Sequence, residues 1–333
     1  MPGTRWLLIE TFGGGEPTVI GLGSAPRKFV PLTQIFRQRE TLASIRGAVA
    51  QTAETLAPVE ITGAGRRTLT VPQLITADRM HSVLVWSGPD HEEVPPRDPV
   101  GAWYFNLSIS KSTRSDDLLD LYGVAPEHRE REHAIAGVFT RVITNSDESD
   151  ALAKVVRSAP GTEHQAVWTV RRDDGALRAA HFSCRMLEER TAAGRSEVYL
   201  RGVTHDIGDA TDVRAAPPPV ILEHRVLDAA AAAGDFRAIV DLRTLRLLRW
   251  MGPAMPGVAW QSLSGEPEPQ IHPDDMGTAK AMSRDLAHSH TSGQLRVRAL
   301  DGGWRTVQAR AVLMALDQHT TAALVTVRDT LPE

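Results

Sequence analysis

The sequence predicts an α+β protein built from three tandem modules, and three observations lead to this fold class. First, two proline-rich stretches, Pro89–Asp98 and Asp209–Pro219, are typical of connectors, because proline lacks an amide donor and stiffens the chain. Second, a glycine turn between two alternating runs recurs in the resulting pieces. Third, helices with similar acidic openings precede two of these turns. We therefore expect modules at residues 1–88, 99–209 and 220–333.

The recurring turn predicts a β-hairpin in each piece. In the second piece, Asp174–Arg178 separates two runs, His164–Arg172 and Leu177–Leu187, in which apolar and polar residues alternate. Asp301–Arg305 has the same place in the third piece, and Gly63–Arg66 has it in the first. A repeat this long indicates duplicated domains rather than a solenoid.

The helix signals complete the predicted module. Ile271–Asp275 opens a helical run to Ala287, with proline in the first turn and acids that complement the helix dipole. Asn145–Glu148 opens a helix through Val156 at a similar distance from its hairpin. Each module then runs strand, strand, short helices, a longer helix and three strands. We expect an antiparallel five-stranded sheet with helices on one face.

Composition excludes several classes of partner. The net charge of −4 argues against a nucleic-acid-binding face. The single cysteine, Cys184, cannot form a disulfide within the chain, which fits a reducing compartment. No apolar run approaches the roughly 18 residues that a membrane helix needs. We expect a cytoplasmic protein with neither nucleic acid nor membrane as partner.

No motif predicts catalysis or a metal site. Gly13–Gly15 is not followed by a helix with Lys-Ser/Thr, so a hairpin turn is favoured over a phosphate loop. His91, Glu92 and Glu93 lie in a proline-rich connector without a second ligand cluster. No serine–histidine–acid set stands at a recognisable elbow. We therefore expect no enzyme activity and no metal, with a divergent enzyme as a minor alternative.

This order of elements and its motifs resemble the Per-Arnt-Sim (PAS) family. The matching segments in the second piece are Gly101–Leu107, Ser115–Gly123, Asp174–Arg178 and Gly202–Ile207, and those in the third are Ile271–Asp275, Asp301–Arg305 and Val327–Asp329. The first piece matches by element order and its turn, and a GAF-like fold stays open for it. The whole chain also resembles uncharacterised actinobacterial proteins that consist of PAS modules alone.

The resemblance implies a sensor that relays a signal. PAS modules hold a small molecule or cofactor between sheet and helices, and their last strand passes the change to a neighbour. No kinase, cyclase, phosphodiesterase or DNA-binding segment follows the third module within the sequence. The implied function is a non-enzymatic sensor or adaptor that signals through a separate partner protein. The alternative is a ligand-free scaffold of degenerate PAS modules that mediates protein–protein assembly.

The same resemblance argues against haem and flavin. Light-sensing PAS domains carry the flavin-adduct cysteine on a helix, whereas Cys184 lies within a predicted strand. Haem-binding members use a histidine in the long helix, and none occurs in the three long helices predicted here, about Arg39–Leu56, Asp147–Ser158 and Asp274–Ala287. His133 and His181 remain as haem candidates. We expect no bound cofactor.

Any ligand pocket is expected to be apolar and to lie in the second module. Small-molecule sites are mostly apolar with a few polar anchors, and the same residues can equally form a plain core. The apolar candidates are Leu118, Leu119, Phe139, Val155, Trp168, Phe182 and Tyr199, with His164 and Arg178 as polar anchors. The ligand class would be a small apolar molecule such as a fatty acid.

Relay and assembly residues are predicted at the module ends. Asp206 and Ile207 end the second module's last strand, and Asp329 ends the third module's, where PAS-like domains pass signals onward. Val220–Ala233 predicts a helix with a partly apolar stripe. We expect a homodimer with Leu227 of this helix at the interface. The alternative is that the helix only covers the sheet of its own module.

Overall fold

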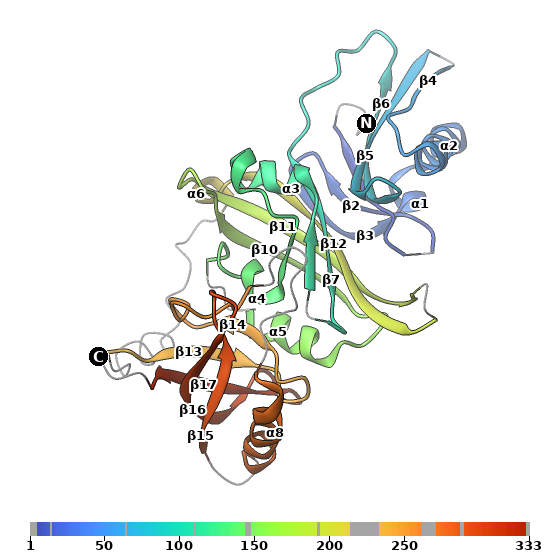
Figure 1. Cartoon of the computed structure of the whole chain (residues 1–333). Coiled ribbons are helices and arrows are strands. Elements are labelled where there is room, and N and C mark those ends of the chain that lie inside the picture. Colours follow the sequence, from blue (N-terminus) through green and yellow to red (C-terminus); the bar gives the residue numbers. More distant parts are fainter. Residues whose placement is uncertain are drawn as a thin grey trace. The chain divides into compact units, whose positions relative to one another are not determined.

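Three antiparallel sheets of six, six and five strands dominate the computed structural model of the chain (Figure 1). The structure describes residues 5–13, 15–63, 65–109, 111–143, 148–191, 194–213, 233–261, 271–286 and 290–330. Helices are few and short beside the sheets. Predominantly antiparallel sheet with a few helices agrees with the α+β prediction. The predicted helix from Val220 and its interface residue Leu227 lie outside the described residues.

The first sheet has the strand order β3-β2-β1-β6-β5-β4. Its strands are β1 (Leu7–Glu10), β2 (Thr18–Leu22), β3 (Ala25–Pro31), β4 (Glu60–Gly63), β5 (Arg66–Thr76) and β6 (Arg79–Pro89), and its helices are α1 (Leu32–Ile35) and α2 (Arg39–Thr55). The helix α2 packs against β5 and β6 and buries Ile45 and Val49 in a core with strand residues such as Ile9 and Val83. Gly13 and Gly15 lie between the paired strands β1 and β2, so a hairpin connects these strands as predicted, and both strands lie inside the sheet, whose edges are β3 and β4.

The second sheet has the order β10-β11-β12-β7-β8-β9. Its strands are β7 (Val100–Asn106), β8 (Lys111–Arg114), β9 (Glu132–Ala134), β10 (Glu163–Arg171), β11 (Leu177–Arg190) and β12 (Ser196–Asp209). The helices of this stretch are α3 (Asp116–Leu121), η1 (Pro126–His128), α4 (Ile135–Val138), α5 (Glu148–Arg157) and α6 (Ala210–Val213). Gly101 is required in β7, because a Cβ atom there would lie 2.3 Å from Cα of Leu118 in α3.

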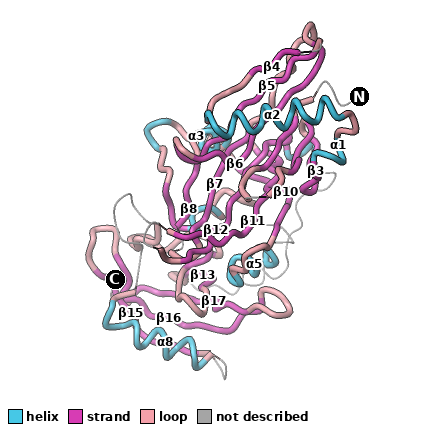
Figure 2. Tube along the Cα trace, turned by 90° about the vertical axis from the view of Figure 1, so that its right-hand side faces the viewer, coloured by secondary structure: helices cyan, strands magenta, loops and turns pink. Residues whose placement is uncertain are grey.

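The third sheet has the order β14-β13-β17-β16-β15. Its strands are β13 (Phe236–Val240), β14 (Leu247–Trp250), β15 (Thr291–Arg298), β16 (Trp304–Ala315) and β17 (Thr321–Asp329), with η2 (Pro273–Asp275) and α8 (Met276–Asp285) as helices. The helix α8 lies beside β15 (Figure 2). The helix predicted from Ile271–Asp275 therefore begins as the 3₁₀ turn η2, with His272 as its N-cap.

The three sheets share one topology. The first and last strands of each set are neighbours, as β1 with β6, β7 with β12 and β13 with β17. The three predicted hairpins are confirmed by antiparallel pairing of β4 with β5, β10 with β11 and β15 with β16. The expectation of five strands holds only for the third sheet, because β3 in the first sheet and β9 in the second add a strand at one edge.

Packing divides the chain into two compact units that do not follow these three sheets. The N-terminal unit comprises Met1–Asn106, Thr113–Arg131 and Pro160–Pro217, and the C-terminal unit comprises Leu107–Ser112, Glu132–Ala159 and Pro218–Glu333. The helices α4 and α5 therefore belong with the third sheet, whereas the sequence predicts α5 within the second module. The boundaries of the three modules stay a prediction.

Within the N-terminal unit, the first and second sheets bury both apolar and charged side chains. One apolar core joins Leu84 and Trp86 of β6 to Val203 of β12. Beside it, Nη1 of Arg201 lies 3.0 Å from Nε2 of the buried His81. Burial, and then the positive charge of Arg201, lowers the pKa of His81 to about 3, so this imidazole is neutral. None of the described helices is long and apolar enough to cross a membrane.

Candidate functional site

A cavity of about 380 Å³ lies in the C-terminal unit, between the third sheet and α8. The sheet contributes small and branched apolar side chains, among them Val240, Val307, Ala309 and Val325, and α8 contributes Met282. A volume of this size falls in the range of about 300–1,000 Å³ that is typical of small-molecule sites. The cavity can therefore hold a small apolar molecule.

A β-bulge in β14 brings Leu247 and Trp250 to the same face of the third sheet. The register of β13 and β14 shifts between Ile239 and Val240, which inserts one extra residue into β14. As a result, Leu247 and Trp250 both line the cavity. Arg249 pairs with Ile239 instead, and neither of these two lines the cavity. Adjacent residues of one short strand thus belong to the cavity wall and to the opposite side of the sheet.

One polar group of the cavity wall lacks a hydrogen-bond partner. Within the described part of the chain, the buried Nε1 of Trp250 has none, and its ring meets the edge of Trp260 at 6.4 Å between centroids. A buried donor without an acceptor costs about 1–3 kcal/mol. A ligand that places an acceptor near Trp250 would remove this cost. The site therefore suits a molecule that is mostly apolar and carries one hydrogen-bond acceptor.

The nine predicted pocket residues do not line this cavity. Leu118 and Leu119 are buried on α3, and Trp168 and Phe182 face each other across β10 and β11 with ring centroids 5.4 Å apart. His164 lies on the same face, with its ring 6.3 Å from that of Trp168. All five residues belong to strands and a helix of the N-terminal unit. Their role in ligand binding stays a prediction.

Tyr199 lies on the opposite face of the second sheet from Phe182, so grouping these two residues in one pocket was wrong. In the antiparallel register Tyr199 pairs with Leu187, while Phe182 pairs with Thr204, and successive residues of a strand point to opposite faces. The ring of Tyr199 meets that of Tyr104 at 5.7 Å, next to the core between the first two sheets. The odd number of residues from Phe182 to Leu187 in β11 decides this, and local sequence patterns carry no information about register.

The other two pocket candidates belong to the C-terminal unit. Phe139 follows α4, and its ring lies 6.0 Å from the guanidinium of Arg249. Val155 is buried on α5. Phe139 therefore packs on the side of β14 that carries Arg249. The sequence signal for the observed cavity was a different one: alanine recurs at inward positions of three strands, as at Ala238, Ala309 and Ala323.

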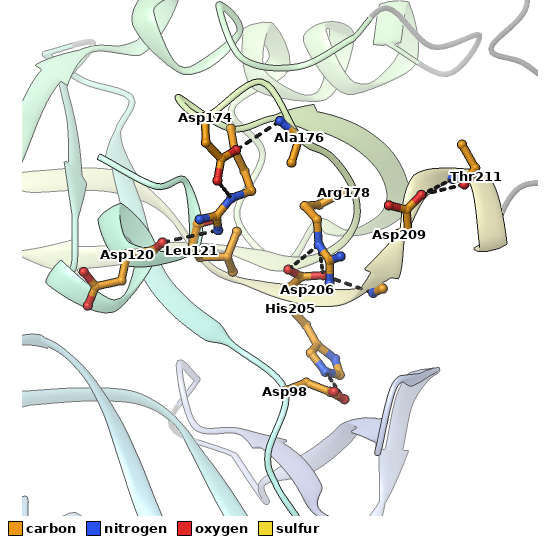
Figure 3. Close-up of polar contacts among 12 residues, drawn as sticks. Asp98, Asp120, Leu121, Asp174, Ala176, Arg178, His205, Asp206, Asp209 and Thr211 are labelled. Atoms are coloured by element: carbon orange, nitrogen blue, oxygen red, sulfur yellow. Dashed lines mark hydrogen bonds and ion pairs between the residues drawn. The ribbon is translucent and has the colours of Figure 1, made fainter. Parts of the chain in front are cut away.

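Arg178 and Asp206 form an ion pair that joins the predicted hairpin to the last strand (Figure 3). Nε of Arg178 lies 2.9 Å from Oδ2 of Asp206, and the hydrogen bond with Asp206 raises the pKa of Arg178. The third sheet repeats this arrangement with Arg305 and Asp329. The arginine of each hairpin turn thus forms a structural ion pair, and a role of Arg178 as a pocket anchor stays a prediction.

Figure 3 also shows a second tie near this strand end, between His205 and Asp98. Nε2 of His205 lies 3.3 Å from Oδ2 of Asp98. Burial acts to raise the pKa of Asp98, but hydrogen bonds from His205 and Ser24 outweigh it, so the pKa is lowered. Ile207, the third predicted relay residue, is buried. The end of β12 is therefore a tightly bonded region.

The described residues give no sign of a metal centre. Among them, no group of three or more His, Cys, Asp or Glu side chains could hold a metal ion. Cys184 is buried, with Sγ 3.5 Å from the carbonyl oxygen of His164. His181 is also buried, and burial, together with His205, lowers its pKa to about 4. His133 lies in β9. The expectation that haem and flavin are absent stays a prediction.

The chain belongs to the Rv3651-like family. The models of the family's N-terminal, middle and C-terminal domains match residues 5–96, 99–206 and 220–333. The middle-domain match includes α5, which packs in the C-terminal unit. No curated protein matches the chain.

Solved structures are similar to the chain at two very different levels. The crystal structure of an uncharacterised protein from Mycobacterium tuberculosis is 29% identical, with a TM-score of 0.85, and the match covers 99% of this chain and 97% of that one. A sensory box histidine kinase/response regulator from Burkholderia thailandensis matches 40% of this chain and 85% of its own, at 17% identity and a TM-score of 0.25. The N-terminal domain of a diguanylate cyclase with PAS/PAC sensor from Marinobacter aquaeolei matches 33% and 95%, at 18% identity and 0.26. The last two TM-scores are too low to establish a shared fold.

Proposed function

We propose that the chain is a non-enzymatic PAS-type sensor that binds a small apolar ligand in the cavity of its C-terminal unit and signals through a separate partner protein. The cavity is the observation on which this proposal depends. A protein that only assembled others would have no need for an apolar cavity of about 380 Å³, because empty space costs packing energy. The repeated sheet topology and the sequence resemblance to PAS modules support the sensor class.

The ligand proposed here is an amphiphile such as a fatty acid, and it binds in the third module rather than the second. The aliphatic wall would cover its chain, and Nε1 of Trp250 would donate to its acceptor oxygen. The nearby Arg298 also lines the cavity, with its guanidinium 4.5 Å from the ring of Trp304. Its charge would favour an anionic head group over a cationic one.

Mass spectrometry of the purified full chain tests this proposal. Solvent extraction should release a stoichiometric apolar molecule, or the chain should bind added dodecanoate with a change in tryptophan fluorescence. Ala309→Phe extends a ring from β16 into the cavity and should reduce occupancy at least about tenfold. Gly63→Ala in the first sheet is the matched control, because its added Cβ atom has no other atom within 4 Å. This variant should bind dodecanoate as the unmodified chain does.

The scaffold alternative has its own supporting observation. Leu118, Leu119, Trp168 and Phe182 in the second module are all buried, which suits a module that serves assembly. If extraction releases nothing and dodecanoate does not bind, the scaffold becomes the better account of the chain. Dodecanoate binding that Ala309→Phe leaves unchanged would place the ligand outside this cavity.

A further inference from the structure

The helix α5 is held to the third sheet at its first residue. Glu148 forms an ion pair with Arg249 of β14, and the two side chains are only 7% and 13% exposed. Burial lowers the pKa of Arg249 to about 10, which still leaves it charged at neutral pH. The ring of Phe139 lies 6.0 Å from the same guanidinium, and α4 packs against β14. A buried pair of this kind fixes geometry, because separating its partners leaves an uncompensated charge.

The strand that holds this pair is also a wall of the cavity. Trp250, next to Arg249 in β14, lines the cavity, and adjacent residues of a strand point to opposite faces of the sheet. A ligand that packs against Trp250 or Leu247 therefore acts on the strand that carries Arg249. Among the described strands, β14 lies at the sheet edge and pairs with β13 alone, so it can shift more easily than a central strand.

The other end of α5 forms an ion pair with a residue that does not line the cavity. Nη1 of Arg157 lies 2.9 Å from Oδ2 of Asp317, in the turn between β16 and β17. Arg243 also donates to the carbonyl oxygen of Val156. Asp317 does not line the cavity, whereas Arg243 lies between Leu242 and Thr244, which do. The ion pair of Arg157 with Asp317 is therefore the contact of this helix end that does not involve the cavity wall.

We propose that the ion pair between Glu148 and Arg249 transmits the occupancy of the cavity to α5, so that ligand binding in the third module alters a helix that the sequence assigns to the second. This inference rests on the proposed function for its ligand. It adds a defined route from the ligand to Trp250 of β14, from its neighbour Arg249 to Glu148, and so to α5. A bound ligand stiffens β14, and the buried ion pair then makes local unfolding of α5 less frequent.

Hydrogen exchange of α5 in the full chain tests this route, with N-phenyl-1-naphthylamine as the cavity probe and its fluorescence as the measure of binding. Saturating probe should slow exchange of the α5 amides at least about threefold in the unmodified chain. Glu148→Gln keeps the length of the side chain and removes its charge. This variant should bind the probe, but the probe should no longer slow exchange of its α5 amides. Asp317→Asn removes the ion pair with Arg157 at the other end of α5, and in this variant the probe should still slow exchange of the α5 amides.

Two outcomes with bound probe overturn the proposal: unchanged exchange of α5 in the unmodified chain, or a full response in Glu148→Gln. If Glu148→Gln is misfolded by circular dichroism, Arg249→Lys replaces it, since it keeps the charge and removes the guanidinium fork. A reduced response is then expected, and a full one overturns the proposal.

A probe that fails to bind contradicts the proposed function, and a second arm still tests the route. Ala279→Leu fills part of the cavity from α8 without any ligand. It should slow exchange of α5 in the unmodified background and leave it unchanged when combined with Glu148→Gln. Unchanged exchange in the single variant overturns the route whether or not the chain binds a ligand.

Discussion

Replacing Asp206 with alanine should destabilise the N-terminal unit, because Arg178 would lose its charge partner. The carboxylate of Asp206 is 3% exposed, accepts from Nε of Arg178 at 2.9 Å, and also accepts from the backbone amide of Gly208 at 3.0 Å. Alanine removes both interactions. Asparagine removes the charge and keeps an acceptor for the Gly208 amide, so it separates the two contributions.

The expected magnitude follows from the burial of the two partners. Removing one partner of a fully buried pair costs about 3–5 kcal/mol. The side chain of Arg178 is 30% exposed, so water can solvate its charge and the cost falls to about 2 kcal/mol. An unsatisfied backbone amide adds about 1 kcal/mol. We expect a loss in unfolding free energy of about 3 kcal/mol for Asp206→Ala and about 2 kcal/mol for Asp206→Asn.

The equivalent pair in the third sheet provides an internal comparison. Arg305 and Asp329 are 28% and 27% exposed, so both charges are partly solvated. Asp329→Ala should therefore cost about 1 kcal/mol or less. The sequence places both aspartates at the same position of the repeat, and only burial separates their expected effects.

Urea unfolding of the full chain, combined with hydrogen exchange of β11 and β12 to assign the transition, measures these differences. Asp206→Ala within about 0.5 kcal/mol of the unmodified chain would refute the reasoning, since that is the range of ordinary surface substitutions. Equal losses for Asp206→Ala and Asp329→Ala would also refute it. A stable Asp206→Ala chain with altered partner binding would instead support the predicted relay role of this residue.

Two further predictions concern the N-terminal unit. The buried imidazoles of His81 and His181 have pKa values lowered to about 3 and about 4, whereas the unfolded chain takes up these protons near 6.5. The unfolding free energy should therefore fall as the pH drops from about 6.5 toward 4, by several kcal/mol, and a urea midpoint that is the same at pH 7.5 and pH 5 would contradict this. Gly101→Ala should cost about 1–3 kcal/mol, because its Cβ would meet the backbone of Leu118 at 2.3 Å. Thermal unfolding within 1 °C of the unmodified chain would show that α3 moves aside freely.

Local signals predicted the hairpins and the repeated module. Asp174–Arg178 and Asp301–Arg305 combine turn chemistry with alternation on both sides, and both signals are readable over about ten residues. The same local signals assigned Tyr199 to the wrong face, because a face depends on the register with β11 and β7. They also could not show that Arg178 pairs with Asp206, since 28 residues separate the two in the chain.

The sequence by itself determined the antiparallel modules, their order and the turn residues, because these depend on neighbours in the chain. Only the tertiary structure decided where empty space remains. A cavity forms where side chains from several distant segments fail to fill the volume between them, as Ala309 and Ala323 do opposite α8. Only the tertiary structure, likewise, brought Glu148 to Arg249, because the packing of α5 on the third sheet depends on burial of both charges between segments about a hundred residues apart.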